Sequence, residues 1–366
     1  VSLPTASFHE EKVCAAVVAF LKEYKIPFEI DRYGNIIAHY QKGPSLKHPL
    51  ALMAHTDHPA FELTSAESSA EFPAANWTAK LLGGVGMDWL KQEMRVKVFP
   101  GNDITRPVEG KMVGAKALNG PRNIQLFMQF SESAGLEPGN FGIWNLTDFE
   151  LRDGFIHARV MDDLVGVTAA MLALWKVSQE GTETDLYAVF TRAEEVGLVG
   201  AELVFQQKLL PAGTYVVSLE ASRTLPGAVQ GEGPVVRVGD RSFTFSEEAE
   251  FALKIAAKTL TAQGAKIQRQ LMSGGRCEAS TAILQGYIST GLAFPLGNYH
   301  NMADDFSLQA ENIHQDDFIT GVELLQEAAR LSPRLAISKA EQLAAESTPQ
   351  ELVDRLLGSR ANFNLG

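Results

Sequence analysis

Five short segments combine histidines and carboxylates, and each lies beside an apolar run, a turn or the start of a helical pattern. Histidine nitrogen and carboxylate oxygen are ligands of zinc and related divalent metals, and a further carboxylate can act as a general base. Metal-assisted chemistry is therefore the first hypothesis that the sequence offers. The segments are His55-Thr56-Asp57, Met161-Asp162-Asp163, Glu194-Glu195, Ser218-Leu219-Glu220 and Tyr299-His300-Asn301.

Each segment, taken alone, also has an ordinary structural explanation. His55 could simply end a strand, and Asp162 could cap a helix, a position that aspartate favours. Glu220 could lie at a strand end, and His300 in a loop, without binding a metal ion. The acidic pair Glu194-Glu195 is the most informative, because it follows an apolar strand and precedes a glycine-rich turn.

Together, the segments supply two histidines and three carboxylates for metal binding, with one glutamate left for proton transfer. A mixed nitrogen and oxygen ligand set suits zinc, or cobalt or manganese, better than calcium. Two ions that share a carboxylate ligand could bind a substrate carbonyl oxygen and lower the pKa of a bridging water. The sequence thus predicts a hydrolase with two divalent ions per chain. The candidate ligands are His55, Asp162, Glu195, Glu220 and His300.

Alternating strands and helices are predicted for most of the chain. Short apolar runs indicate buried strands at residues 50–54, 186–190, 215–219 and 286–293. Helical spacing of apolar residues indicates helices at about residues 10–25, 164–176, 197–207, 247–263 and 315–331. This order is typical of an α/β fold with a mostly parallel central sheet and helices on both faces. Sites in such sheets lie at the carboxyl ends of the strands, where several of the candidate residues fall.

A small β-rich insert is expected within this α/β pattern. Between about residues 65 and 150, glycine, proline and asparagine become frequent, and the apolar runs are short and alternating. Such a pattern favours a closed or sandwiched sheet. We expect a catalytic domain made of residues 1–68 and 152–335, an inserted β-rich domain at 69–151, and a C-terminal helical tail at 336–366.

The composition argues against several other classes of protein. The formal net charge of -12 disfavours nucleic acid and an anionic membrane surface as partners. No apolar run of about 18 residues predicts a membrane-spanning helix. Only two cysteines occur, Cys14 and Cys277, and no signal peptide is visible, so we expect a cytoplasmic protein. No G-x-S-x-G motif supports a serine hydrolase.

The order of the motifs resembles the glutamyl aminopeptidase and tetrahedral aminopeptidase family of dinuclear metallopeptidases, which includes relatives named endoglucanases. The series is H-T-D, D-D-L-V-G, E-E-V-G-L-V-G-A, S-L-E and Y-H-N, and it extends over about residues 7–331. The third motif is the most specific. The resemblance implies a zinc aminopeptidase-like fold, a peptide substrate, and a homo-oligomer supported by the inserted domain.

The resemblance also implies a ligand set for two divalent ions, which we expect to be zinc, with cobalt or manganese as alternatives. His55 and Glu220 would bind one ion, and Glu195 and His300 would bind the other. Asp162 would bridge the two ions.

Three further roles follow from the same resemblance. Glu194 would be the general base, and Asp57 would orient His55. A cis peptide bond would join Asp162 to Asp163.

Some positions depart from the family pattern. Glu220 stands where aspartate is usual, and Leu164 stands where arginine is usual. The segment G-G-R-C-E-A replaces G-G-T-D-A and contains Arg276, which could bind an acidic side chain or a substrate carboxylate, or form a structural salt bridge. These departures concern the substrate pocket and subunit contacts more than the ligands.

Two other functions remain compatible with the motifs. A deacylase or carboxypeptidase-like hydrolase could use the same metals, and it would release an acyl group or a C-terminal residue. A non-catalytic binding or assembly protein could retain the same scaffold, although the complete ligand set and Glu194 argue against it.

Overall fold

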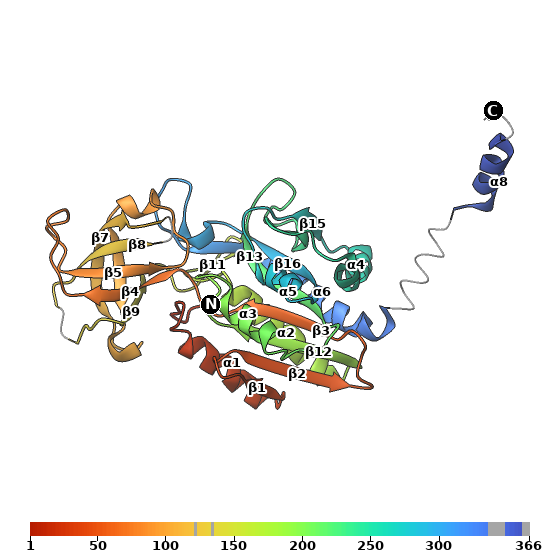
Figure 1. Cartoon of the computed structure of the whole chain (residues 1–366), viewed down its shortest axis with the longest axis horizontal. Coiled ribbons are helices and arrows are strands. Elements are labelled where there is room, and N and C mark those ends of the chain that lie inside the picture. The colour runs from red at the N-terminus through yellow and green to blue at the C-terminus, as the bar shows by residue number, and fades with distance from the viewer. Residues whose placement is uncertain (121–122, 133–134, 336–347, 361–366) are drawn as a thin grey trace.

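The chain has a mixed α/β fold with a closed β-barrel beside it (Figure 1). The computed structural model describes residues 1–120, 123–132, 135–335 and 348–360. The helices are α1 (Glu11–Glu23), α2 (Leu164–Glu180), α3 (Val199–Gln206), α4 (Glu247–Ala262), α5 (Glu278–Leu284), α6 (Gln315–Leu331) and α8 (Gln350–Ser359).

An eight-stranded sheet forms the centre of the α/β part. In spatial order its strands are β1 (Phe28–Ile30), β2 (Ile36–Lys42), β12 (Thr184–Thr191), β3 (Leu50–His55), β13 (Tyr215–Arg223), β16 (Ile288–Leu296), β14 (Val235–Gly239) and β15 (Gln268–Leu271). The four neighbours β12, β3, β13 and β16 pair in parallel, as do β14 and β15. The pairs β1–β2, β2–β12 and β14–β16 are antiparallel, so the sheet is mixed.

Helices cover both faces of this sheet, as the continuous apolar run of β3 requires. Every residue of β3 is buried. Leu50 and Leu52 pack in a cluster with residues of α1, α2, α4 and α6, whereas Ala51 and Met53 pack on the opposite face with residues of α3 and α5. Successive side chains of a strand point to opposite faces, which explains this division. The packing fixes β3, and therefore His55 at its carboxyl end.

A six-stranded closed barrel lies between β3 and β12 in the sequence. Its strands are β4 (Ala60–Ser65), β5 (Trp77–Leu82), β6 (Met94–Val98), β7 (Val108–Ala117), β8 (Ile124–Gln129) and β9 (Phe141–Trp144), in the spatial order β4-β5-β8-β7-β6-β9. The barrel has its own apolar core, which includes Phe61, Trp77 and Trp144. Its first strand begins at Ala60, before the expected boundary at residue 69.

A separate three-stranded sheet joins distant parts of the chain. It contains β10 (Glu150–Arg152), β11 (Phe155–Ala158) and β17 (Glu311–His314), with β11 in the centre. Both of its pairings are antiparallel. The sheet therefore brings the segment before α2 next to the segment that follows His300.

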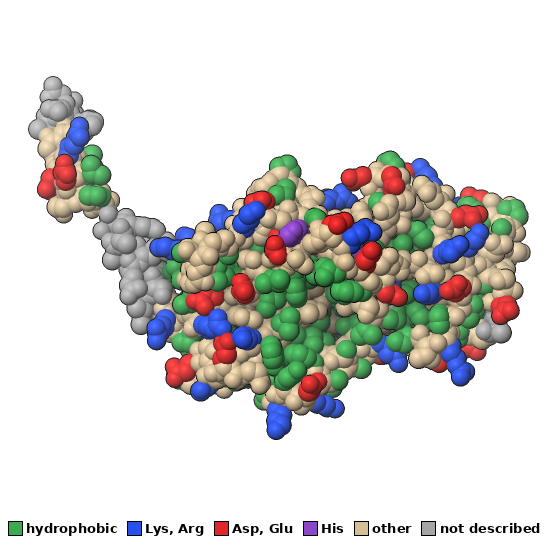
Figure 2. All heavy atoms as spheres, turned by 180° about the vertical axis from the view of Figure 1, so that it is seen from behind, with side chains coloured by type: hydrophobic (Ala, Val, Ile, Leu, Met, Phe, Trp, Pro, Cys, Tyr) green, Lys and Arg blue, Asp and Glu red, His purple; other side chains and the backbone are tan. Residues whose placement is uncertain are grey.

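The C-terminal tail contributes α8, and none of its side chains is buried. This helix lies within the expected tail at residues 336–366, of which residues 336–347 and 361–366 lie outside the described residues. None of the described helices is long and apolar enough to cross a membrane. On the face drawn in Figure 2, acidic and basic side chains are interspersed around a central area of apolar side chains.

Candidate metal centre

The segments predicted to hold metal ligands converge at one edge of the central sheet. His55 ends β3, Glu220 lies on β13, and Glu195 follows β12. His300 follows β16, and Asp162 lies two residues before the start of α2. Because β12, β3, β13 and β16 run parallel, their carboxyl ends meet at this edge. The structure therefore brings together five residues that are widely separated in the sequence.

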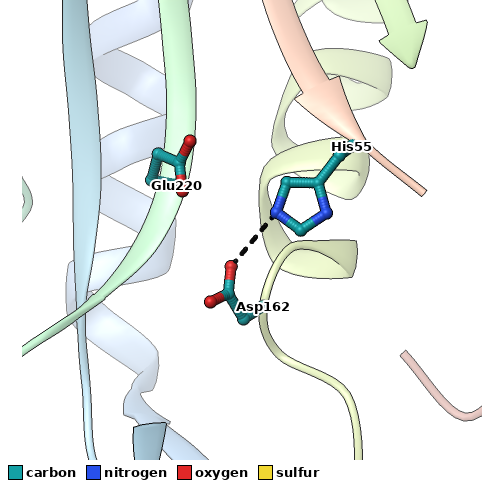
Figure 3. Close-up of side chains that lie close together, drawn as sticks. All are labelled: His55, Asp162 and Glu220. Atoms are coloured by element: carbon teal, nitrogen blue, oxygen red, sulfur yellow. Dashed lines mark ion pairs between the residues drawn. The ribbon is translucent and has the colours of Figure 1, made fainter. Parts of the chain in front are cut away.

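Asp162 lies between the two histidines, with one carboxylate oxygen toward each. Its Oδ1 lies 3.4 Å from Nε2 of His55, and its Oδ2 lies 3.5 Å from Nε2 of His300. Glu220 completes the His55 side of the cluster, as Figure 3 shows, and Glu195 completes the other side, 3.2 Å from His300 Nε2. In each group of three, ligand atoms lie within 4.8 Å of one another. Asp162 thus belongs to two adjacent groups.

Backbone carbonyl groups orient both imidazole rings. Nδ1 of His55 lies 3.1 Å from the carbonyl oxygen of Asp57, and Nδ1 of His300 lies 2.6 Å from that of Gly84. A carbonyl oxygen can only accept, so Nδ1 is the donor in each ring. The neutral ring then presents the lone pair of Nε2 toward Asp162, which is the tautomer of a metal-binding histidine.

The carboxylate of Asp57 connects His55 to the acidic pair. It lies 3.5 Å from Nδ1 of His55 and accepts hydrogen bonds from the backbone N–H groups of Glu194 (2.9 Å) and Glu195 (3.1 Å). The hydroxyl of Ser7 donates to it as well, at 2.6 Å. Asp57 is fully buried. The orientation of the histidine and the position of the acidic turn therefore depend on the same carboxylate.

The cluster concentrates negative charge in a buried place. Burial raises the pKa of Glu220 to about 8 and raises that of Glu194 well above its usual value. Although burial by itself lowers the pKa of His55 and of His300, the adjacent carboxylates raise both well above normal. Without another cation, protons compensate the carboxylates, so the charge balance favours a positively charged ligand.

The donor set fits divalent ions. Asp162 Oδ1 and Glu195 Oε1 are buried and have no hydrogen-bond partner among the described residues. Buried polar atoms of this kind normally have a partner, and a bound ion would supply it. Imidazole nitrogen with carboxylate oxygen is a typical ligand set for zinc. A third group, formed by His55, Glu194 and Glu195, is also close enough to bind an ion.

The two aspartates that follow Met161 have different surroundings. The peptide bond between Asp162 and Asp163 is cis, as the resemblance to the family implies. Asp163 caps α2, because its carboxylate accepts a hydrogen bond from Gly166 N–H at 3.2 Å. The helix-cap explanation therefore applies to Asp163, while Asp162 faces the histidines.

Glu311 is a buried residue of this region that the sequence does not indicate. Its carboxylate accepts hydrogen bonds from the backbone N–H groups of Met161 (2.7 Å), Asp162 (3.0 Å) and His300 (2.8 Å). It is fully buried on β17.

The sequence does not indicate His58 either, although this residue is next to the H-T-D motif. Its Nδ1 lies 2.5 Å from the carbonyl oxygen of Asp162. Neither residue can be recognised from local sequence, because each has partners more than 100 residues away in the chain.

The N-terminal segment supports the acidic turn from the other side. The carboxylate of Glu10 pairs with Arg192 at 2.7 Å and accepts a hydrogen bond from the backbone N–H of Ala193 at 3.0 Å. Glu10 is fully buried. The segment before α1 therefore helps to hold the turn that carries Glu194 and Glu195.

The barrel contacts the site through the segment that follows β5. Gly84, whose carbonyl group orients His300, belongs to this segment. Trp89 Nε1 donates a hydrogen bond to the carbonyl oxygen of Ala303 at 2.6 Å, and Met302 packs against the barrel core. His300 is thus held by both parts of the molecule.

Two cavities open beside the cluster, and both are lined by Tyr299 and the loop at residues 274–276. One, of about 530 Å³, is lined by Glu194, Glu195 and His300. The other, of about 400 Å³, is lined by Glu220 and several arginines. Arg276 is exposed and lines both cavities. The candidate substrate-binding residue therefore lies next to the site.

Solved structures of known proteins share this fold. The TET1 peptidase of Pyrococcus horikoshii is 21% identical, with 89% of this chain and 96% of that chain covered and a TM-score of 0.71. The TET aminopeptidase of Thaumarchaeota archaeon SCGC AB-539-E09 is 20% identical over 90% of this chain and 94% of that chain, with a TM-score of 0.72. An endoglucanase of Thermotoga maritima is 18% identical over 92% and 96%, with a TM-score of 0.63. The fold is therefore that of the TET aminopeptidases.

Sequence comparison places the chain in a family. Residues 128–319 match the family described as M42 glutamyl aminopeptidase, which is more than half of the chain. A protein of Acetivibrio thermocellus that is named as a predicted aminopeptidase is 24% identical over 339 residues, which cover 88% of this chain and 94% of the relative. The chain belongs to the M42 family of dinuclear metallopeptidases and is a peptidase, which confirms the resemblance seen in the motifs.

Proposed function

We propose that this protein is an aminopeptidase that removes N-terminal residues from peptides with the help of two divalent metal ions. The observation that carries the proposal is the position of Asp162, whose two carboxylate oxygens face Nε2 of two different histidines. Membership of the M42 family supports the class of reaction. The proposal adds the metal site and the direction of cleavage.

The ligands divide into two sets that share Asp162. His55 and Glu220 would hold one ion, and Glu195 and His300 would hold the other. Zinc suits this donor set best, and cobalt or manganese would also fit. When bound, the ions polarise the scissile carbonyl and lower the pKa of the attacking water. Glu220 is one methylene longer than the usual aspartate and still reaches the group that contains His55 and Asp162.

Glu194 is the proposed general base. Its Oε2 lies 3.9 Å from His55 Nε2, and its side chain lines the 530 Å³ cavity. From this position it would take a proton from water and pass it to the leaving amine. Asp57 accepts a hydrogen bond from the backbone N–H of Glu194 and also orients His55. It therefore fixes the position of the proposed base relative to one proposed metal ligand.

Metal content and product analysis test the proposal directly. Protein loaded with zinc, cobalt or manganese should hold two ions per chain by elemental analysis and release the N-terminal residue from short peptides. His300→Ala should lose at least one ion and most of the activity. His157→Ala, at a histidine outside the cluster, should retain both.

Other outcomes would select other functions. Release of a C-terminal residue or an acyl group would identify a carboxypeptidase-like enzyme or a deacylase. A folded, metal-loaded protein that cleaves no peptide in a broad panel would contradict the proposal and favour a binding protein.

We also propose that the chain forms a homo-oligomer. The similar TET1 peptidase of Pyrococcus horikoshii is described as assembling into a tetrahedron or a large octahedral shell. The shared fold covers 89% of this chain, which supports a comparable assembly. Light scattering coupled to size-exclusion chromatography measures the mass, and a monomer of 39.8 kDa would contradict the proposal.

A further inference from the structure

Helix α8 has an apolar face that no other described part of the chain buries. At 100° per residue, four apolar side chains lie on one side of this helix, namely Leu352, Val353, Leu356 and Leu357. Leu356 is 74% exposed, and none of the side chains of α8 is buried. Isolated helices shorter than about 12 residues are marginally stable in water, and packing of an amphipathic face stabilises them in proteins. The ten-residue α8, which Figure 1 shows apart from the rest of the molecule, therefore requires a partner surface.

Opposite charges flank the two sides of this apolar face. Asp354 lies about 60° beyond Leu357 around the helix, and Arg355 lies about 60° before Leu352. Both charged side chains are exposed. A surface that receives the face should therefore be apolar at its centre and should offer one positive and one negative charge at its rim.

A cavity of about 350 Å³ in the α/β part of the molecule has this character. Lys47 precedes β3 and Glu248 lies on α4, and these two exposed residues give the cavity one charge of each sign. Tyr215 is the first residue of β13, so the cavity lies at the amino ends of the parallel strands, opposite the edge that carries the metal centre. The apolar residues that line the cavity are Leu46, Tyr215, Phe251, Pro333 and Leu335.

The tail leaves the α/β part at this same cavity. Leu335 lines the cavity and is the last described residue before the segment that leads to α8. A chain of the length that joins Leu335 to Gln350 spans at most about 50 Å. Two copies that exchange their tails would each start the tail beside the cavity that the other copy fills, which suits a two-fold arrangement. The tail also lies outside residues 128–319, the segment that matches the family.

We propose that α8 of one copy of this chain docks into the 350 Å³ cavity of a second copy, and that the two copies exchange their tails. The apolar face fills the centre of the cavity. Asp354 then faces Lys47 of the partner subunit, and Arg355 faces Glu248 of the partner subunit. The second copy is the partner because α8 buries no side chain against its own chain. The inference rests on the proposed homo-oligomer and is independent of the peptidase activity.

Two cysteine variants of the full chain test whether the contact joins different copies. Leu356→Cys and Leu46→Cys, made in separate chains and then mixed and oxidised, should give a disulfide-linked pair with twice the chain mass of 39.8 kDa. Leu118→Cys, at an exposed residue that follows β7 of the barrel, replaces Leu46→Cys in the control and should give no such pair. A Leu46→Cys/Leu356→Cys double variant that closes the disulfide within one chain would overturn the exchange.

A labelled peptide of residues 348–360 measures the docking itself. The receptor is full-length Leu356→Asp, whose own α8 is kept out of the cavity by the cost of burying an unpaired charge. The peptide should bind this receptor in fluorescence anisotropy. Its affinity should fall at least about tenfold when the peptide carries Leu356→Asp, because the burial of one leucine is lost. Adding Leu46→Glu to the receptor should have a similar effect, whereas Leu118→Glu should have none.

Charge reversal tests the orientation of the helix. Lys47→Glu in the receptor should weaken binding of the peptide by about two- to fivefold, the range for exposed ion pairs. A peptide with Asp354→Lys should regain this loss on the Lys47→Glu receptor and should bind the unreversed receptor more weakly. A peptide with Arg355→Glu should show the corresponding behaviour with Glu248→Arg.

Three results would overturn the docking. They are no binding of the peptide to the Leu356→Asp receptor, equal affinities with and without Leu46→Glu, and binding of the peptide to phosphatidylcholine–phosphatidylglycerol vesicles but not to the protein. The last result would assign α8 to a membrane surface. If light scattering still shows an oligomer in these cases, the proposed homo-oligomer stands without this contact, whereas a monomer would overturn both proposals.

Discussion

Asp162 is held from several directions at once. Its oxygens face His55 and His300, its backbone N–H donates to Glu311, and its carbonyl oxygen lies 2.5 Å from Nδ1 of His58. These contacts come from distant parts of the chain and restrict both the backbone and the side chain. A bridging ligand needs such support, because small displacements change its distance to two ions at once.

Glu194→Gln separates metal binding from proton transfer. The amide cannot accept a proton from water, and Glu194 is outside the two ligand groups that share Asp162. We expect turnover to fall at least about 100-fold while metal content remains at the wild-type level. Steady-state kinetics and elemental analysis of the same sample measure both. Turnover close to that of wild type would rule out Glu194 as the base.

Glu311→Gln tests the support beneath the ligands. The carboxylate accepts three backbone N–H bonds, and an amide would turn N–H groups toward at least one of these donors. We expect the free energy of unfolding to fall by about 1–3 kcal/mol and zinc affinity to fall roughly 10- to 100-fold. Chemical denaturation and zinc titration measure the two effects. Glu323→Gln, at an exposed glutamate on α6, is the control, and equal behaviour of the two variants would contradict the assignment.

The sequence reveals residues of this site when the signal is local. His55, Glu195 and His300 stand in short motifs next to predicted strands, so their types and contexts suffice to propose ligands. Ser7 and Glu311 have no such context, because they contribute to the site through hydrogen bonds to distant residues. Their partners lie 50 and about 150 residues away, respectively. Only the folded chain brings these groups together.

At the level of elements, the start of α2 depends on a glycine. A Cβ atom at Gly166 would lie 2.3 Å from Oδ2 of Asp163, which caps the helix and follows Asp162 directly. Gly166→Ala should therefore displace the cap and lower the free energy of unfolding by about 1–3 kcal/mol. Denaturant unfolding followed by circular dichroism measures the change.

Gly358 on α8 provides the matched control for this substitution. A Cβ atom there meets no atom of the described residues within 4 Å, and alanine favours a helix. Gly358→Ala should leave global stability unchanged. If Gly166→Ala is as stable as Gly358→Ala, the cap tolerates the extra methyl group and the steric argument fails.

The central strands could be predicted, but not the direction of every pairing. The apolar runs at 50–54, 186–190, 215–219 and 286–293 correspond to β3, β12, β13 and β16. Burial on both faces produces such runs whichever direction the neighbour takes, so the antiparallel partners of β12 and β16 have no distinct signal. The edge strand β15 was missed because its Gln-Arg-Gln-Leu sequence is largely polar and half-exposed.

At the level of the whole molecule, metal removal should lower stability. The cluster buries several carboxylates, and a ligand that binds only the folded state stabilises it by mass action. We expect chelation to lower the Tm of the wild-type protein and zinc to restore it. His300→Ala should respond less to both treatments. Scanning calorimetry checks this, and a Tm unaffected by chelation of a protein shown to have lost its metal would contradict it.

The sequence does not predict how the barrel is arranged relative to the central sheet. Short alternating runs predict a compact β structure but contain no information about its contacts with distant segments. Trp89 and Met302 make such contacts, and they lie more than 200 residues apart. The side chains involved are ordinary apolar residues, which have many possible partners in an unfolded chain.

The carbonyl group of Gly84 gives the barrel a thermodynamic connection to the chemistry. It fixes the ring of His300, so any association that shifts the segment after β5 changes the energy of ion binding. Reciprocity then requires that ion binding change the strength of that association by the same factor. If subunit association contacts this segment, association would raise or lower the affinity for the ions. Ion binding would then raise or lower the affinity of association by the same factor. Subunit association would in that case regulate metal binding through the hydrogen bond between His300 and the carbonyl oxygen of Gly84.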